Sequence, residues 1–170
     1  MTKKTYLRQL ATEADKLFTG QAIEQYAAIC YRWRPGQEDV EVLLITSRES
    51  GRWVIPKGWP MDKKLPHQVA EREAWEEAGV NGKARKKSFG YYTYLKSLDT
   101  GETVPSVVQV HLLEVAGMSA KFPEHGQRQL EWFSPNEAAA LVREPELKGL
   151  LRMVDIAVAK AEKTKDSNAK

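Results

Sequence analysis

The stretch from Gly58 to Val80, GWPMDKKLPHQVAEREAWEEAGV, decides how the centre of this chain folds. Side chains three and four residues apart lie on one face of a helix, so Glu73, Glu76 and Glu77 form a single carboxylate cluster. The opposite face carries small apolar residues, namely Ala70, Ala74 and Ala78. Small residues at this period let a helix pack closely against a sheet. The stretch therefore predicts a helix with one packed face and one acidic face.

Both ends of this helix carry local signals. Pro66 suits the first helical position because its missing N–H costs nothing there, and Gly79 suits the left-handed residue that ends a helix. Leu65 is a poor N-cap, since its side chain offers no acceptor. We therefore expect the helix to begin at Pro66 and to end before Gly79.

The carboxylate cluster has two interpretations. A solvated acidic surface is the simpler explanation of three glutamates alone. However, neighbouring carboxylates repel one another unless a cation screens them, and Mg²⁺ prefers such oxygen ligands together with phosphate oxygens. Arg72 lies one turn before Glu76 and can orient it. The phased arginine and the two flanking glycines, Gly58 and Gly79, favour a metal site beside a diphosphate.

The segment resembles the Nudix box: glycine, five residues, glutamate, seven residues, then Arg-Glu-hydrophobic-any-Glu-Glu-any-Gly-hydrophobic. Ala74 occupies the first hydrophobic position, and the other matching positions are Gly58, Arg72, Glu73, Glu76, Glu77, Gly79 and Val80. Lys64 stands where the pattern has its first glutamate and is expected to add a positive charge at the mouth of the site. Asp62, in the same loop, is a candidate replacement. The replacement of this glutamate by Lys64 affects the number of metal ions that the site is expected to bind.

The resemblance implies a metal-dependent active site. It implies Mg²⁺, with Mn²⁺ as a substitute, held by Glu73, Glu76, Glu77 and the main-chain carbonyl of Lys57 or Gly58. Glu76 is the expected catalytic residue, either as a metal ligand or as the base toward the attacking water, and Arg72 is expected to hold it in place. Glu124 and Glu131 are alternative bases, because some Nudix branches use a carboxylate from that region.

Three basic residues are the expected substrate-binding residues: Arg48, Lys57 and Arg52. An arginine fork and a lysine point charge both suit phosphate oxygens. Arg48 has a second interpretation as a surface residue at the end of a strand, where charged residues are common.

The similarity runs from about residue 25 to about residue 139 and most resembles bacterial relatives of the diphosphoinositol polyphosphate phosphohydrolases. It rests on Ser47-Arg48, on residues 51–60 (GRWVIPKGWP) and on Glu131-Trp132-Phe133. The resemblance implies hydrolysis of a phosphoanhydride bond in a nucleoside diphosphate derivative, a dinucleoside polyphosphate or a diphosphoinositol polyphosphate. The alternatives are a catalytically weak Nudix-fold ligand-binding module and an RNA 5′-end pyrophosphohydrolase.

Basic residues cluster directly after the predicted helix, at Lys83, Arg85, Lys86 and Lys87. Such a cluster attracts polyanions, although the net charge of the chain is only +3. It fits a solvated turn, a funnel for a phosphate-rich small molecule, or a nucleic-acid surface. A phosphate-rich small molecule is the expected partner, and nucleic acid is the less favoured alternative.

Length and composition fit one domain. A chain of 170 residues with 42% hydrophobic content is long enough to bury a substantial core. We expect a cytoplasmic enzyme, monomeric or homodimeric and without membrane contact, because no secretory leader and no run of about eighteen apolar residues is evident. The single Cys30 excludes an intramolecular disulfide, and its apolar neighbours indicate a buried strand residue.

The residue patterns and the resemblance together predict an α/β/α sandwich around a central mixed β-sheet. Strands are expected near 25–34, 40–47, 53–56, 86–97, 106–114 and 130–133. Helices are expected over 6–18, 66–78, 135–142 and 145–161, followed by a frayed tail to residue 170. The Nudix core of this single domain is expected over about 25–143. Ser134 and Glu137 form a capping box at the third of these helices.

Overall fold

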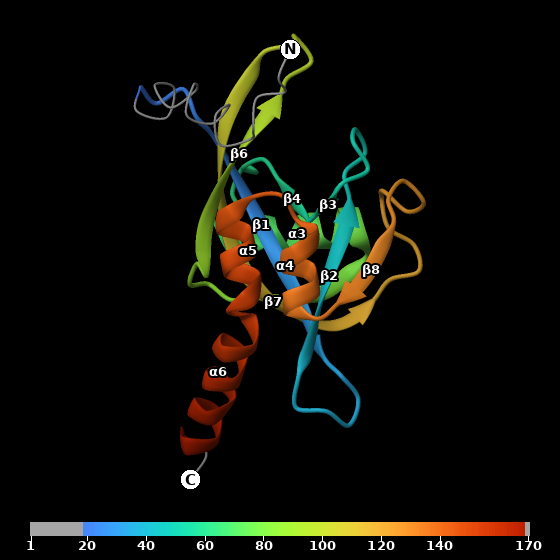
Figure 1. The fold of residues 1–170 in the computed structure, drawn as a ribbon, viewed down its shortest axis with the longest axis vertical. Helices are drawn as coiled ribbons and strands as arrows, with labels where there is room; N and C mark the ends of the chain where they lie inside the picture. The colour runs from blue at the N-terminus through green and yellow to red at the C-terminus, as the bar shows by residue number, and fades with distance from the viewer. Residues whose placement is uncertain (1–18, 169–170) are drawn as a thin grey trace.

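Figure 1 shows the computed structural model, which describes residues 19–168. Its strands form one eight-stranded mixed sheet: β1 (Ile23–Trp33), β2 (Val40–Thr46), β3 (Trp53–Val54), β4 (Lys57–Gly58), β5 (Val80–Ala84), β6 (Gly90–Ser97), β7 (Thr103–Met118) and β8 (Leu130–Phe133). Its helices are α3 (Pro66–Ala78), α4 (Pro135–Leu141), α5 (Pro145–Arg152) and α6 (Val154–Asn168). The helix expected over 6–18 lies outside the described residues.

The central pair of the sheet, β1 and β7, is parallel, with Ile23 opposite Ser106 and Tyr31 opposite Glu114. Strand β2 pairs antiparallel with β1, β8 and β3, while β6 and β5 pair antiparallel with β7. A tight connection at residues 98–102 joins β6 to β7 as an antiparallel hairpin. The mixed character expected of the sheet is therefore confirmed.

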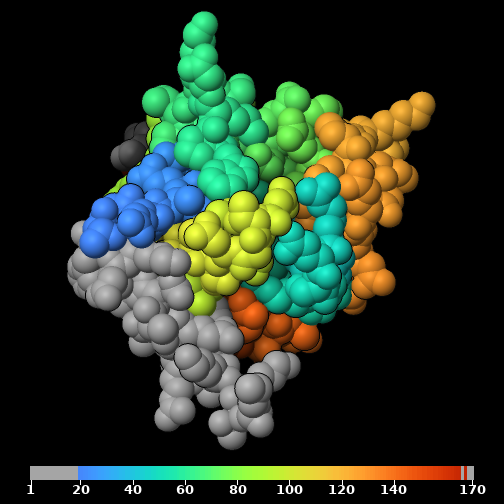
Figure 2. All heavy atoms as spheres, turned by 90° about the horizontal axis from the view of Figure 1, so that it is seen from above, coloured from blue at the N-terminus to red at the C-terminus, as the bar shows by residue number. Residues whose placement is uncertain are grey.

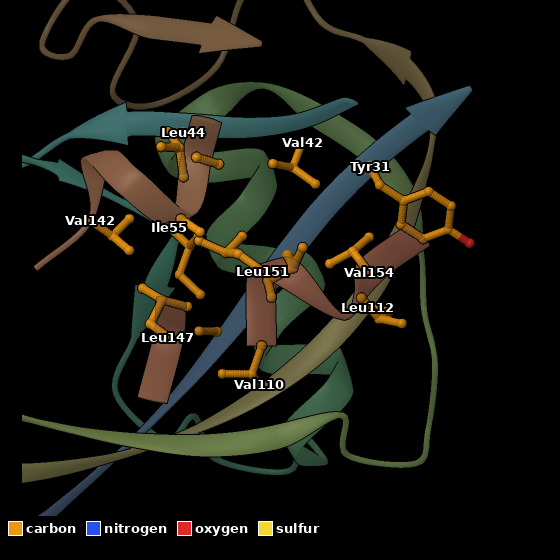
Figure 3. Close-up of a cluster of buried hydrophobic side chains, with 14 of the residues drawn as sticks. Tyr31, Val42, Leu44, Ile55, Val110, Leu112, Val142, Leu147, Leu151 and Val154 are labelled. Atoms are coloured by element: carbon orange, nitrogen blue, oxygen red, sulfur yellow. The ribbon is translucent and has the colours of Figure 1, made fainter. Parts of the chain in front are cut away.

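Alternate residues of β1 face two different cores, because helices cover both faces of the sheet. On one face, Ala28 and Cys30 pack with the alanines of α3. On the other, Ala27 and Ile29 pack with α4, α5 and α6, and Figure 3 shows residues from these helices meeting Val42, Val110 and Leu112. Cys30 is fully buried, as expected, and burial raises the pKa of its thiol.

Helix α3 begins and ends at the predicted residues. Pro66 occupies its first turn, and Gly79 ends it in the left-handed region with φ of 68°. Leu65 offers no side-chain cap, and Gln68 Oε1 accepts a hydrogen bond from the Leu65 N–H at 2.9 Å instead. Ala74, in the middle of the packed face, has no exposed surface. The acidic face lies beside this packed face, where Glu73 and Glu77 contact β4.

Strand β5 was not predicted, and the strand expected over 86–97 begins only at Gly90. The β5 sequence VNGKA contains Asn and Gly, which strands disfavour. It forms a strand because β7 pairs with it, with a bulge between Asn81 and Gly82. An added Cβ at Gly82 would overlap the carbonyl oxygen of Glu114, so the close approach of the two backbones requires glycine there.

The predicted C-terminal helix is wrong in two respects. It is divided at Met153, whose N–H bonds the carbonyl oxygens of Leu150 and Leu151, and its second part continues to Asn168 where a frayed tail was expected. Tightening the turn at Met153 lets Leu151 and Val154 enter the same core. The capping box at Ser134 is confirmed, since Ser134 Oγ accepts the Glu137 N–H. No helix within residues 19–168 is long and apolar enough to cross a bilayer.

Replacing Gly149 with alanine is expected to stabilise the protein by about 0.5–1 kcal/mol. Gly149 is exposed in the middle of α5, and an added Cβ would meet no atom within 4 Å. The free energy of unfolding from urea titration measures the gain. Gly79→Ala is the matched control and should destabilise the protein, because its φ is positive and its Cβ would lie 2.5 Å from the Phe122 ring. A loss of stability in Gly149→Ala would contradict the prediction.

Candidate functional site

A cavity of about 660 Å³ lies where the acidic face of α3 meets β4, the β6–β7 hairpin and the loop between β2 and β3. Figure 2 looks onto this end of the molecule, where the cyan loop near residue 50 and the yellow hairpin near residue 100 lie against each other. The charged and polar lining residues include Gln25, Arg48, Arg52, Lys57, Glu73, Glu77, Lys96, Glu124, Arg128 and Arg143. Two carboxylates of one helix thus face a wall of basic side chains.

Glu77 is the most firmly held of the predicted metal ligands. Its Oε1 lies 2.9 Å from Arg128 Nη2, and its Oε2 accepts the backbone N–H of Lys57 at 3.2 Å. Burial raises the pKa of Glu77, and the charges of Arg128 and Lys57 oppose that rise. The Glu77 carboxylate is therefore fixed at the junction between α3 and β4.

Arg128 was not predicted as a site residue, yet it connects three parts of the site. Its side chain is only 7% exposed, and it contacts Glu77 at 2.9 Å, Glu124 Oε2 at 2.9 Å and the Thr46 carbonyl at 3.0 Å. A single arginine in an irregular loop carries no periodic signal. The one local cue was its spacing of four residues from Glu124.

Glu73 lies against the backbone of Gly58. An added Cβ at Gly58 would overlap the Glu73 carboxylate, so any larger residue at this fixed glycine of the motif would displace that carboxylate. Burial, together with the charges of Glu77, Glu76 and Glu124, raises the pKa of Glu73 to about 7. A cation bound at this point would relieve the unfavourable crowding of negative charge.

The structure confirms contact between Arg72 and Glu76 but does not bring either side chain to the cavity wall. Arg72 Nε and Glu76 Oε1 form an ion pair one turn apart, and Arg72 also lies over the Trp75 ring at 4.7 Å. Glu76 remains close enough to Glu73 for its charge to raise the pKa of that carboxyl. Arg72 lines a shallower depression on the other side of α3.

Lys64 lines that same depression, with Gln68 and Glu71. The expectation that Lys64 adds charge at the mouth of the site is therefore wrong. The chain turns into α3 at Pro66, which leaves Lys64 on the side of the helix opposite the cavity. Asp62 is exposed and does not line the cavity either.

Of the two alternative bases, only Glu124 lines the cavity. Its backbone N–H donates to the Glu76 carbonyl at 3.0 Å, which pins the loop to the end of α3, and its Oε1 lies 3.1 Å from Arg48 Nη1. Glu131 is exposed on β8, opposite Leu44, and is not part of the cavity.

All three predicted substrate-binding residues line the cavity: Arg48, Arg52 and Lys57. Burial lowers the pKa of Lys57 to about 8, although the charge of Glu77 opposes this. Lys96, on β6, adds a further basic side chain, with its Nζ 5.6 Å from the Trp59 ring. The basic cluster at residues 83–87 lies on β5 and the following loop and lines no part of this cavity.

The donor atoms fit Mg²⁺. Within residues 19–168, no three His, Cys, Asp or Glu side chains are arranged as a complete metal site. Mg²⁺ does not require one, since it is commonly held by one or two carboxylates with water and phosphate oxygens completing the shell. Glu73 and Glu77 supply two carboxylates at the cavity wall, beside the main chain of Lys57 and Gly58.

The sequence of this chain is similar to a known domain family and to several known proteins. The NUDIX domain family matches residues 24–154. Nudix hydrolase 21, chloroplastic, from Arabidopsis thaliana is 31% identical over an alignment of 139 residues, and the match covers 72% of this chain and 66% of that protein. Diphosphoinositol polyphosphate phosphohydrolase 3-alpha from Mus musculus is 41% identical over 56 residues, 33% of this chain and 34% of that protein. The chain therefore matches less than two thirds of either relative's length.

Solved structures agree on the fold. A C. elegans Ap4A hydrolase binary complex superposes with a TM-score of 0.60 at 21% identity and covers 82% of this chain and 99% of that one. The NUDIX domain of Shewanella oneidensis NrtR, complexed with ADP ribose, gives a TM-score of 0.56 at 15% identity over 82% of this chain and 96% of that one. The expected α/β fold, with helices on both faces of a mixed sheet, is confirmed. Because the domain match spans most of its length, the chain belongs to the Nudix family.

Proposed function

We propose that this protein is a metal-dependent pyrophosphohydrolase that cleaves a phosphoanhydride bond in a nucleoside diphosphate derivative, a dinucleoside polyphosphate or a diphosphoinositol polyphosphate. One observation carries the proposal: Glu73 and Glu77 line a single cavity together with Arg48, Arg52 and Lys57. Carboxylates suit a divalent cation, and the basic side chains suit phosphate oxygens. The negative charge of a diphosphate bound in this cavity would be neutralised both by the cation and by the basic side chains.

The metal would be held by Glu73 and Glu77 with the main-chain carbonyl of Lys57 or Gly58. When bound, Mg²⁺, or Mn²⁺ in its place, would neutralise charge on the phosphate oxygens and lower the pKa of the attacking water. The protein itself orients the substrate. Arg48 offers a planar donor fork to phosphate oxygens, Arg52 adds the charge of its guanidinium at the cavity wall, and Lys57 offers a compact charge from the buried side of the cavity.

We assign the base to Glu76, held in place by Arg72. The ion pair between the two side chains supports this role, and the charge of Glu76 acts on the neighbouring Glu73. Glu124 is the second candidate because it lines the cavity. Glu76→Gln is expected to lower kcat by about 10²–10⁴-fold, the usual contribution of a general base. Glu131→Gln, an exposed glutamate on β8, is the matched control and should retain the wild-type rate. A wild-type rate in Glu76→Gln with a large loss in Glu124→Gln would move the role to Glu124.

The reaction is tested by measuring phosphate or pyrophosphate release with Mg²⁺ and with Mn²⁺. The substrates are diadenosine polyphosphates, nucleotide sugars, nucleoside triphosphates, diphosphoinositol polyphosphates and triphosphorylated RNA. Metal-dependent release from one small-molecule class is the expected result. Release from RNA alone, with strong salt dependence, would favour the RNA 5′-end alternative. Binding without release would favour a ligand-binding module, the alternative for which Lys64 in place of the first box glutamate is the supporting observation.

A further inference from the structure

We propose that Glu144 is a positioning residue for phosphate binding: it holds the Arg52 guanidinium at the cavity wall from beneath. The proposal rests on the proposed function, in which Arg52 contacts a substrate phosphate. Glu144 itself does not line the cavity and would act through Arg52.

Glu144 comes from a part of the chain far from the Nudix box. It precedes α5, directly after Arg143, which lines the cavity. Its side chain is 2% exposed, and its Oε1 lies 2.8 Å from Arg52 Nη2, whose side chain is 25% exposed. Figure 1 shows α4 and α5 on the same face of the sheet. The ion pair between Glu144 and Arg52 joins the junction of these helices to the loop that precedes β3. The C-terminal helices thereby contribute to the cavity.

Neither helix capping nor packing accounts for a charge at this position. The Glu144 side chain makes no capping hydrogen bond to α5. Among the described residues, both of its oxygens and Arg52 Nη1 are buried without a hydrogen bond of good geometry. Replacing a buried ion pair with apolar side chains is commonly neutral or stabilising, so stability alone would favour a hydrophobic residue.

A role in substrate binding does account for the charge. Arg52 and Lys57 line the same cavity, and their positive charges repel each other. The negative charge of Glu144 pairs with Arg52, so it offsets this repulsion before any phosphate is bound. Glu144 therefore keeps two cations close together, in the arrangement that a diphosphate requires, and the substrate finds its binding groups already oriented.

The test is a double-mutant cycle that requires no turnover. Isothermal titration calorimetry measures binding of methylenediphosphonate, a diphosphate analogue whose P–C–P bridge cannot be hydrolysed, in the presence of Mg²⁺. Glu144→Gln is expected to weaken binding about 10-fold, the lower end of what loss of an orienting partner costs. Arg52→Gln should weaken it at least as much, and the double variant should bind no more weakly than Arg52→Gln alone, because Glu144 acts only through that arginine.

Two further variants separate positioning from a general structural role. Glu146→Gln, at an exposed site two residues along α5, should bind like the wild type. Glu144→Asp keeps the charge on a shorter side chain and should bind more tightly than Glu144→Gln; it also serves in the cycle if Glu144→Gln does not fold. A wild-type protein that does not bind the probe, wild-type affinity in Glu144→Gln, or additive losses in the double variant would each overturn the proposal.

The outcomes also separate this inference from the proposed function. Coupled losses of binding in a protein that hydrolyses nothing in the substrate panel would leave the role of Glu144 standing and refute the hydrolase. Metal-dependent hydrolysis with additive losses would support the hydrolase and refute the role of Glu144.

Discussion

Replacing Glu73 with glutamine is expected to lower kcat/KM about 10³-fold and to raise the melting temperature of the metal-free protein. A bound metal supplies several kcal/mol of transition-state stabilisation, and loss of one of its two cavity-wall carboxylates removes much of that. The stability of the metal-free protein is expected to rise, although the activity falls. The pKa of Glu73 is raised from 4.5 to about 7, so the metal-free protein loses stability as the pH rises through that range. The glutamine side chain is uncharged at every pH, so the variant does not lose this stability.

Steady-state kinetics with saturating Mg²⁺ and thermal unfolding in a chelator at pH 8 measure the two effects together. The opposite signs distinguish loss of a ligand from simple misfolding, which would lower activity and melting temperature alike. Glu38→Gln, an exposed glutamate between β1 and β2, is the control and should change neither quantity. Activity within about threefold of the wild type in Glu73→Gln would show that this carboxylate does not hold the metal.

Replacing Gly58 with alanine is expected to lower kcat/KM about 10²-fold. The added methyl group would overlap the Glu73 carboxylate, so the loop or the glutamate must move. A displacement of about 1 Å among reacting groups is enough for a loss of that size. Both Glu73, the proposed metal ligand, and the neighbouring main-chain carbonyls would shift together, which should also reduce the rise in melting temperature expected on adding Mg²⁺.

Gly117→Ala is the matched control for this variant. Gly117 also lies in a strand with an ordinary φ, and its added Cβ would meet nothing within 4 Å. Kinetics and Mg²⁺-dependent melting of both variants should separate them clearly. Equal activities would show that the contact between Gly58 and Glu73 has no part in the reaction.

The sequence alone determined the features that depend on neighbouring residues. The bounds of α3 follow from Pro66 and Gly79, and its packed face follows from the spacing of its alanines. The capping box at Ser134 and the burial of Cys30 follow from similarly local patterns. These features were predictable because each of them depends only on residues within the same helical turn or the same strand.

Strand β5 and the division between α5 and α6 show where local preference was overruled. The sequence VNGKA becomes a strand because β7 supplies its hydrogen-bonding partner. The chain turns at Met153 so that residues on both sides of it reach one core. In each case, the free energy of packing exceeds the small local propensities that a sequence pattern reports.

The composition of the cavity was decided only by the tertiary structure. The Nudix resemblance indicated Glu73 and Glu77, and the affinity of cationic side chains for phosphate indicated Arg48, Arg52 and Lys57. All five line the cavity. The side chains that hold these residues came from elsewhere: Arg128 pairs with Glu77, and Glu144 pairs with Arg52.

These two contacts join segments that are distant in the chain. Arg128 reaches Glu77 because β8 pairs with β2 and so brings the preceding loop beside α3. Glu144 reaches Arg52 because α4 and α5 pack on the sheet below the β2–β3 loop. Helix and strand periodicities relate only residues a few positions apart, so they cannot report such long-range contacts. The sequence therefore determined which residues are candidates for the chemistry. The packing of the sheet and helices decided which other side chains orient them.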